Sequence, residues 1–173
     1  VLDDGYIILP NGRRVDAKPS FRLIGAMNPP EYEGRNMLSP ALRSRMKEVW
    51  VDNVEDKEIP DIVKFYLDKN KIEKTEELSK LLSNIHIAIR DKFKEYKFTI
   101  RDLIYFTEFM VNAKNDNTAK SIIRGALYVY QDKLGRDKDK TEFTAILESK
   151  LADINKFSKK PIKIEDVMAM PAP

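Results

Sequence analysis

The spacing of hydrophobic and polar residues divides the chain into two parts. In residues 1–52 the apolar positions form short runs bounded by turn residues, a pattern typical of strands. In residues 58–155 they recur three or four positions apart, a pattern typical of amphipathic helices. We therefore expect a piece built of strands and turns, followed by a helical piece.

The first part predicts a hairpin followed by a buried strand. The apolar run at residues 6–9 leads into Asn11 and Gly12, and Asn-Gly is the strongest short hairpin signal. Residues 14–17 can form the returning strand. Residues 21–27 are mostly apolar and stop at an Asn-Pro-Pro sequence, which suits a buried parallel strand.

A short helix and a second buried strand are predicted next. Ser39 suits the N-cap and Pro40 the first position of a helix that runs to about Arg45. The apolar run at residues 49–51 is predicted as the strand. Hairpin, strand, helix and strand make a piece of an α/β sheet, because two central strands cannot cover both faces of a sheet alone.

Apolar stripes at helical spacing predict several helices that pack on one core. A polar, acidic linker at residues 55–60 precedes most of them. The stripes span residues 59–67, 78–93, 100–110, 122–134 and 143–154. His86 lies in the second stripe, where a structural histidine is expected rather than a ligand.

The tail from residue 158 is predicted to be irregular, with a short strand at residues 162–164, because three prolines interrupt it. The predicted division is therefore 1–54 for the α/β part, 55–157 for the helical domain and 158–173 for the tail. The chain as a whole is expected to be mainly helical.

Composition excludes several kinds of site. There is no cysteine and a single histidine, so neither a disulfide nor a zinc site is expected. Charged residues make up 34% of the chain, but the net charge is only +3, and their alternation indicates solvated helix faces. Nucleic acid is therefore an improbable partner. No apolar run approaches the roughly 18 residues of a membrane span, and we expect a cytoplasmic protein without metal ligands.

Asn28 is the first candidate for chemistry. It follows the predicted strand at residues 21–27 and precedes two prolines. Ligands of open parallel sheets bind beyond the carboxyl ends of the strands, where an amide can both donate to a phosphate and accept from a water. On this feature alone, a plain turn asparagine before proline is the preferred explanation.

Three arginines are the other candidates. Arg43 and Arg45 lie at the end of the predicted short helix, where a cation suits the helix dipole but can also reach a neighbouring subunit's phosphate. Arg101 follows Thr99 in a predicted capping box completed by Asp102. A cation in the first helical turn is unfavourable, so Arg101 is either an anion-binding residue or an exposed surface arginine.

The order and spacing of these residues resemble AAA+ ATPases of the MoxR and midasin (dynein-related) group. The resemblance covers about residues 2–51 and extends to the helical part through one short motif. It is carried by Leu2-Asp3-Asp4-Gly5, Ile8-Leu9-Pro10-Asn11-Gly12, Phe21-Arg22-Leu23-Ile24-Gly25-Ala26-Met27-Asn28-Pro29, Tyr32-Glu33-Gly34, Leu38-Ser39-Pro40-Ala41-Leu42-Arg43-Ser44-Arg45 and Phe98-Thr99-Ile100-Arg101-Asp102-Leu103.

The resemblance implies the end of a P-loop NTPase α/β domain followed by an all-helical lid. Asn28 would be the sensor 1 residue that orients the attacking water. Arg45 would be the arginine finger acting in a neighbouring subunit, with Arg43 a second candidate or helper, and Arg101 would be the sensor 2 arginine. The family hydrolyses ATP with Mg²⁺ in rings, usually hexameric, and remodels or matures protein complexes, often with a von Willebrand A-domain protein.

Two departures from the family pattern qualify the resemblance. Met46 follows the finger arginine where the family often has phenylalanine. No glycine is followed by lysine, and no apolar run leads into Asp-Glu, so the phosphate loop and the Walker B motif are missing. We expect both upstream of residue 1 and expect this chain alone to be inactive, with no tightly bound ATP.

Two other functions remain open on the sequence. A non-enzymatic helical module that binds a protein partner predicts that Asn28 and Arg101 can be changed without effect on assembly. A nucleic-acid-binding domain predicts strongly salt-dependent binding, and the small net charge argues against it.

Overall fold

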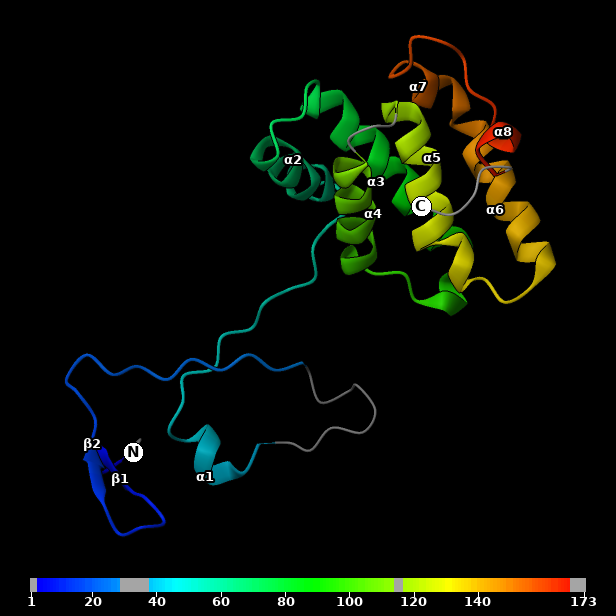
Figure 1. Cartoon of the computed structure of the whole chain (residues 1–173). Coiled ribbons are helices and arrows are strands. Elements are labelled where there is room, and N and C mark those ends of the chain that lie inside the picture. The colour runs from blue at the N-terminus through cyan, green and yellow to red at the C-terminus, as the bar shows by residue number, and fades with distance from the viewer. Residues whose placement is uncertain (1–2, 29–37, 114–116, 169–173) are drawn as a thin grey trace. The chain divides into compact units, whose positions relative to one another are not determined.

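The computed structural model describes residues 3–28, 38–113 and 117–168. The chain divides into two compact units, Val1–Asp52 and Asn53–Pro173. Within the described residues the protein is mainly helical, with one two-stranded sheet in the first unit (Figure 1). The mainly helical composition predicted from the sequence is confirmed.

A hairpin is the only sheet among the described residues of the first unit. It pairs β1 (Tyr6–Ile8) with β2 (Arg14–Asp16) in antiparallel register. Gly12 closes the turn with a φ of +80°, in the left-handed region that favours glycine. The Asn11 side chain accepts a hydrogen bond of 3.1 Å from the backbone N–H of Arg13. The predicted Asn-Gly hairpin is confirmed.

The two buried strands predicted for this unit do not form, so that part of the prediction is wrong. Residues 21–27 and 49–51 adopt neither helix nor strand, and their side chains are exposed. Ile24 is 91% exposed and Val51 is 84% exposed. A strand needs a hydrogen-bonded neighbour, and among the described residues β1 and β2 pair only with each other.

The short helix of the first unit is α1 (Pro40–Arg43). Ser39 caps it, because its hydroxyl accepts a hydrogen bond of 3.3 Å from the backbone N–H of Leu42. Proline occupies the first helical position, where no backbone N–H is needed. The cap and the proline are therefore confirmed, although the helix ends two residues earlier than Arg45.

The second unit is built from helices joined by short turns. Three of the predicted stripes correspond to single helices, the stripe at residues 122–134 covers α5 and the short helix η2, and the last stripe is divided by Lys150 into two helices. The elements are α2 (Ile59–Lys69), α3 (Thr75–Lys92), η1 (Lys94–Tyr96), α4 (Ile100–Asn112), α5 (Thr118–Val129), η2 (Gln131–Lys133), α6 (Asp137–Ser149), α7 (Leu151–Asn155) and α8 (Ile164–Met168).

These helices share one hydrophobic core. In it α2 packs on α3, α4 packs on α5, and α2 also contacts α4, so these four helices form two adjacent pairs (Figure 1). Tyr130, Phe106 and Phe143 are its largest fully buried side chains. Gly125 lets α5 approach α4 closely, because a Cβ there would lie only 3.0 Å from Cδ2 of Phe106.

The end of the described chain is helical where a strand was predicted. The strand expected at residues 162–164 is wrong, because Ile164 begins α8 and, with Val167 one turn later, is buried in the core. The backbone of Ile162 is occupied by Asn155, whose side chain donates to its carbonyl at 3.2 Å and accepts from its N–H at 2.9 Å. No backbone group of Ile162 is left for strand pairing.

Candidate functional site

Asn28 ends the first described stretch and is exposed. It follows residues 21–27, which form no strand, so the structure does not place it at the carboxyl end of a sheet strand. Asn28 takes part in at least one interaction. The prolines predicted to fix it begin at residue 29, outside the described residues. The sensor role of Asn28 therefore stays a prediction.

Arg43, at the last position of α1, is held by a carboxylate in the same unit. Its Nε donates to Oε1 of Glu48 at 2.6 Å, and its Nη2 donates to Oε2 at 3.0 Å. This two-point geometry is the strongest form of an arginine–carboxylate pair. The hydrogen bonds from Arg43 lower the pKa of the Glu48 carboxyl. About half of each side chain stays exposed, so the pair is accessible from solvent.

Arg45 is also paired, but with a distant part of the sequence. Its guanidinium forms an ion pair with Asp3 and donates a hydrogen bond to the backbone carbonyl of Ala41. Arg43 and Arg45 thus leave the same end of α1 toward different carboxylates. Because a guanidinium has five N–H donors and these contacts use only some of them, a phosphate could bind either arginine beside its carboxylate or in its place.

Arg101 lies in the first turn of α4 and is exposed. The predicted capping box is confirmed: the Asp102 carboxylate accepts hydrogen bonds from the backbone N–H of Thr99 at 2.7 Å and from its hydroxyl at 3.0 Å. Burial acts to raise the pKa of Asp102, but hydrogen bonds from Lys133 and Thr99 outweigh it and lower that pKa. Within the described chain no hydrogen bond or ion pair holds the Arg101 side chain, so it keeps an unpaired charge at a helix N-terminus.

The candidate residues are divided between the two units. Arg43 and Arg45 share the end of α1, whereas Arg101 belongs to the second unit.

Residues 1–46 match the family model of the AAA domain, dynein-related subfamily. The match supports an AAA+ ATPase portion in this part of the chain. It includes Asn28, Arg43 and Arg45 and ends well before Arg101. No solved structure matches the chain. The MoxR and midasin subgroup stays a prediction.

The AAA domain family implies the use of ATP and Mg²⁺ by the intact protein. Among them, no three histidine or acidic side chains gather as a metal-binding group. Arg43, the last residue of α1, pairs with Glu48, and Arg45, two residues later, pairs with Asp3. No described helix is both long enough and apolar enough to cross a membrane.

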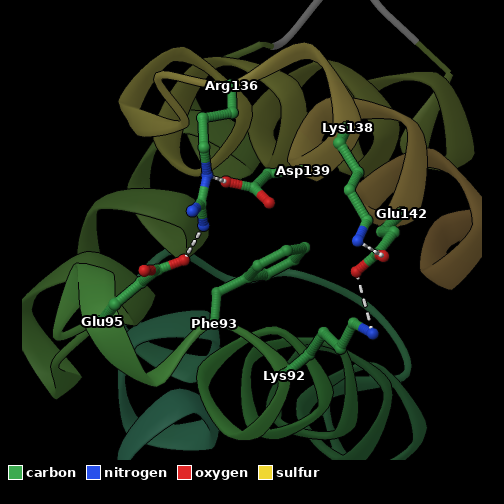
Figure 2. Close-up of a pocket in the computed structure, with 7 residues that line it drawn as sticks. All are labelled: Lys92, Phe93, Glu95, Arg136, Lys138, Asp139 and Glu142. Carbon is green, nitrogen blue, oxygen red and sulfur yellow. Dashed lines mark hydrogen bonds and ion pairs between the residues drawn. The ribbon is translucent and has the colours of Figure 1, made fainter.

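A surface pocket of about 340 Å³ in the second unit was not predicted from the sequence. Figure 2 shows Phe93 between two sets of ion pairs that join the end of α3 and η1 to the start of α6. The Lys92 ammonium forms an ion pair of 2.8 Å with the Glu142 carboxylate, and the Arg136 guanidinium forms one of 2.7 Å with the Asp139 carboxylate. The charges that line the pocket neutralise one another, so it offers no unpaired charge to a ligand. It is lined by Lys92, Phe93, Glu95, Arg136, Lys138, Asp139 and Glu142.

His86 is fully buried, as predicted for a structural histidine. Its Nδ1 lies 2.9 Å from the Tyr130 hydroxyl. Burial lowers the pKa of His86 to about 4, and the nearby Arg90 cation adds to this effect. The buried Nε2 has no hydrogen-bond partner among the described residues. His86 is therefore a neutral core residue and takes no part in the candidate site.

Proposed function

We propose that the first unit is the final part of an AAA+ nucleotide-binding domain and that the helical unit is its lid. The intact protein would couple ATP hydrolysis to the remodelling or maturation of protein complexes. The match of residues 1–46 to the AAA domain family carries the proposal. The exposed apolar runs at residues 21–27 and 49–51 support it, because neighbouring strands of a complete sheet would cover them.

The candidate residues receive distinct roles in this proposal. Asn28 orients the attacking water, because an amide can donate and accept at once. Arg45 acts as the finger in the neighbouring subunit's site, where a guanidinium stabilises transition-state charge. Arg101 meets a phosphate at the N-terminus of α4 and couples nucleotide to the lid.

The ion pairs favour Arg45 over Arg43 as the finger. Arg43 is held at two points by Glu48, which lies only five residues further along the chain. A local two-point pair suits a helper that stiffens the end of α1. Arg45 pairs instead with Asp3, 42 residues earlier, a contact that subunit assembly can replace.

The proposal extends to assembly and partners. ATP and Mg²⁺ would be bound by the intact protein in a ring, because the finger must act between subunits, and the family resemblance implies that the ring is hexameric. The substrate would be a protein complex, and a von Willebrand A-domain protein is the partner class implied by the family resemblance.

The test is Arg45→Ala in the intact protein. We expect nucleotide binding to stay near the wild-type level and ATP turnover to fall by about 10³-fold or more, the usual effect of losing a finger. Arg14→Ala is the matched control, because Arg14 also pairs with an aspartate and lies in the same family match. Unchanged turnover would contradict the assignment and make Arg43 the next candidate.

A second candidate function is a non-enzymatic module that binds a protein through apolar contacts. The observation that favours it is the exposure of large apolar side chains in the first unit, such as Val49 and Trp50. ATP turnover by the intact wild-type protein decides between the two functions, since this module has none.

A further inference from the structure

The second unit begins with a closed turn at residues 55–58. The backbone N–H of Glu58 donates to the carbonyl of Glu55 at 2.9 Å. The Glu58 carboxylate accepts a hydrogen bond of 2.9 Å from the backbone N–H of Glu55. Because α2 starts at the next residue, Ile59, the turn continues directly into a helix whose first side chain is fully buried.

Arg90, near the end of α3, fastens this turn to the helical core. Its Nη1 donates to Oδ1 of Asp56 at 2.7 Å, and its Nη2 donates to Oδ2 at 2.9 Å. Asp91 accepts from Nε of Arg90 at 3.0 Å, which holds the guanidinium from the other side. The hydrogen bonds from Arg90 lower the pKa of the Asp56 carboxyl. A lysine could not reproduce this planar, two-point contact.

A neighbouring ion pair, between Lys64 of α2 and Glu76 of α3, has a less restrained geometry. Lys64 donates to a single oxygen of Glu76 at 2.7 Å, so it lacks the planar, two-point contact of Arg90, although Lys80 pairs with the other Glu76 oxygen at 2.9 Å. Exposed pairs of this kind contribute little, because solvent screens them and two flexible side chains must be ordered. The Arg90 side chain is only 30% exposed, and α3 behind it is anchored by fully buried residues such as Ile85 and Ile89.

We infer that Arg90 is a positioning residue: it fixes, through Asp56, the point at which the chain enters the helical unit. The second unit starts at Asn53, and the residues before Glu55 form no helix or strand, whereas Arg90 ties Asp56 to α3. If the helical unit is the lid, loss of this anchor leaves the start of the lid free to move and slows ATP turnover. That consequence for turnover rests on the proposed function, whereas the docking of the turn does not.

Hydrogen exchange in this chain tests the docking. We expect Arg90→Ala to speed exchange of the Glu55 and Glu58 amides by about five- to tenfold, since the turn then opens more often. Arg90→Lys should fall between wild type and Arg90→Ala. Lys64→Ala is the matched control and should change exchange less than about twofold. Circular dichroism confirms that each variant is folded.

Exchanging the two charges of the Asp56–Arg90 pair distinguishes loss of the ion pair from a local disturbance caused by either substitution. Asp56→Arg combined with Arg90→Glu should restore much of the protection that each single change removes, because the pair is re-formed with opposite polarity. Unchanged exchange in Arg90→Ala, or equally fast exchange in Lys64→Ala, would overturn the docking.

Turnover of the intact protein tests the positioning role. Arg90→Ala should lower kcat by about fivefold or more while KM for ATP stays within about twofold, with Arg90→Lys between them. An unchanged kcat beside faster exchange would overturn the coupling and leave the docking in place. Absence of ATPase activity in the wild-type protein would refute the proposed function alone, because the exchange result does not depend on ATP.

Discussion

The two units contain similar apolar side chains and use them in opposite ways. In the helical unit Tyr130 packs edge-on against Phe98 and Phe106, at ring distances of 5.2 Å and 5.6 Å, and is fully buried. In the first unit no described residue is buried, and Trp50 is 67% exposed. Apolar composition therefore does not produce a core until two layers of structure meet over it.

The difference also concerns what holds each unit together. The hairpin of the first unit has strands of three residues, and α1 has four, lengths that are marginal in isolation. Its long-range ties include the exposed pair between Arg45 and Asp3. The helical unit adds buried hydrogen bonds and caps to its core, so we expect it to carry nearly all of the chain's cooperative stability.

Among the changes considered, truncation of a buried aromatic ring in the helical unit should lower the free energy of unfolding the most. Phe106→Ala leaves a cavity beneath Gly125 and should lower the free energy of unfolding by about 3–5 kcal/mol. Ile24→Ala in the first unit should change it by less than about 0.5 kcal/mol. Urea unfolding followed by far-ultraviolet circular dichroism measures both. A comparable loss in Ile24→Ala would show that the first unit has a core of its own.

Acid should weaken the helical unit through His86, the next largest effect. The pKa of His86 is lowered from 6.5 to about 4 in the folded protein, so between these values the unfolded chain binds a proton that the folded chain refuses. Stability should therefore be highest above pH 6.5 and should fall by roughly 3 kcal/mol as the pH approaches 4. Thermal unfolding measured across this range gives the slope.

His86→Gln is the control for this pH dependence. It keeps a polar side chain on the same face of α3 but cannot titrate, so the loss between pH 6.5 and 4 should become much smaller. An equal loss in the variant would assign the effect to carboxylates instead. Because the sequence has one histidine, the first unit contributes nothing to this titration.

Removal of a helix cap should lower the free energy of unfolding the least. The loss should be larger for a cap in the helical unit than for one in the first unit. Asp102→Ala deprives Thr99 of its partner and Lys133 of its counter-charge, and should cost about 1–2 kcal/mol of unfolding free energy. Ser39→Ala removes the cap of α1 and should leave the main unfolding transition unchanged. Chemical unfolding of the two variants side by side makes the comparison.

Local chemistry was readable from the sequence wherever it was decided by near neighbours. The Ser39 cap, the Asn-Gly hairpin and the capping box of Thr99 and Asp102 depend on residues within about one turn, and all are confirmed. The predicted helical stripes are confirmed, because an apolar face that repeats along a helix is buried in the core whichever helix packs against it.

The failures concern features that depend on distant partners. Residues 21–27 have the apolarity of a strand, but nothing in the run itself supplies the neighbour that a strand requires. At Ile162 the pattern could not show that Asn155 would take both backbone groups. The same limit applies to the site, since the sequence placed Arg43 and Arg45 together but not their partners Glu48 and Asp3.

Trp50 gives the contrast between the units an optical consequence. It is the single tryptophan of the sequence, lies in the first unit and donates from Nε1 to Asp52 at 2.9 Å. Its indole emission reports the polarity around residues 49–51 alone, without background from the helical unit. The protein thus has a built-in fluorophore on an apolar segment whose side chains are exposed.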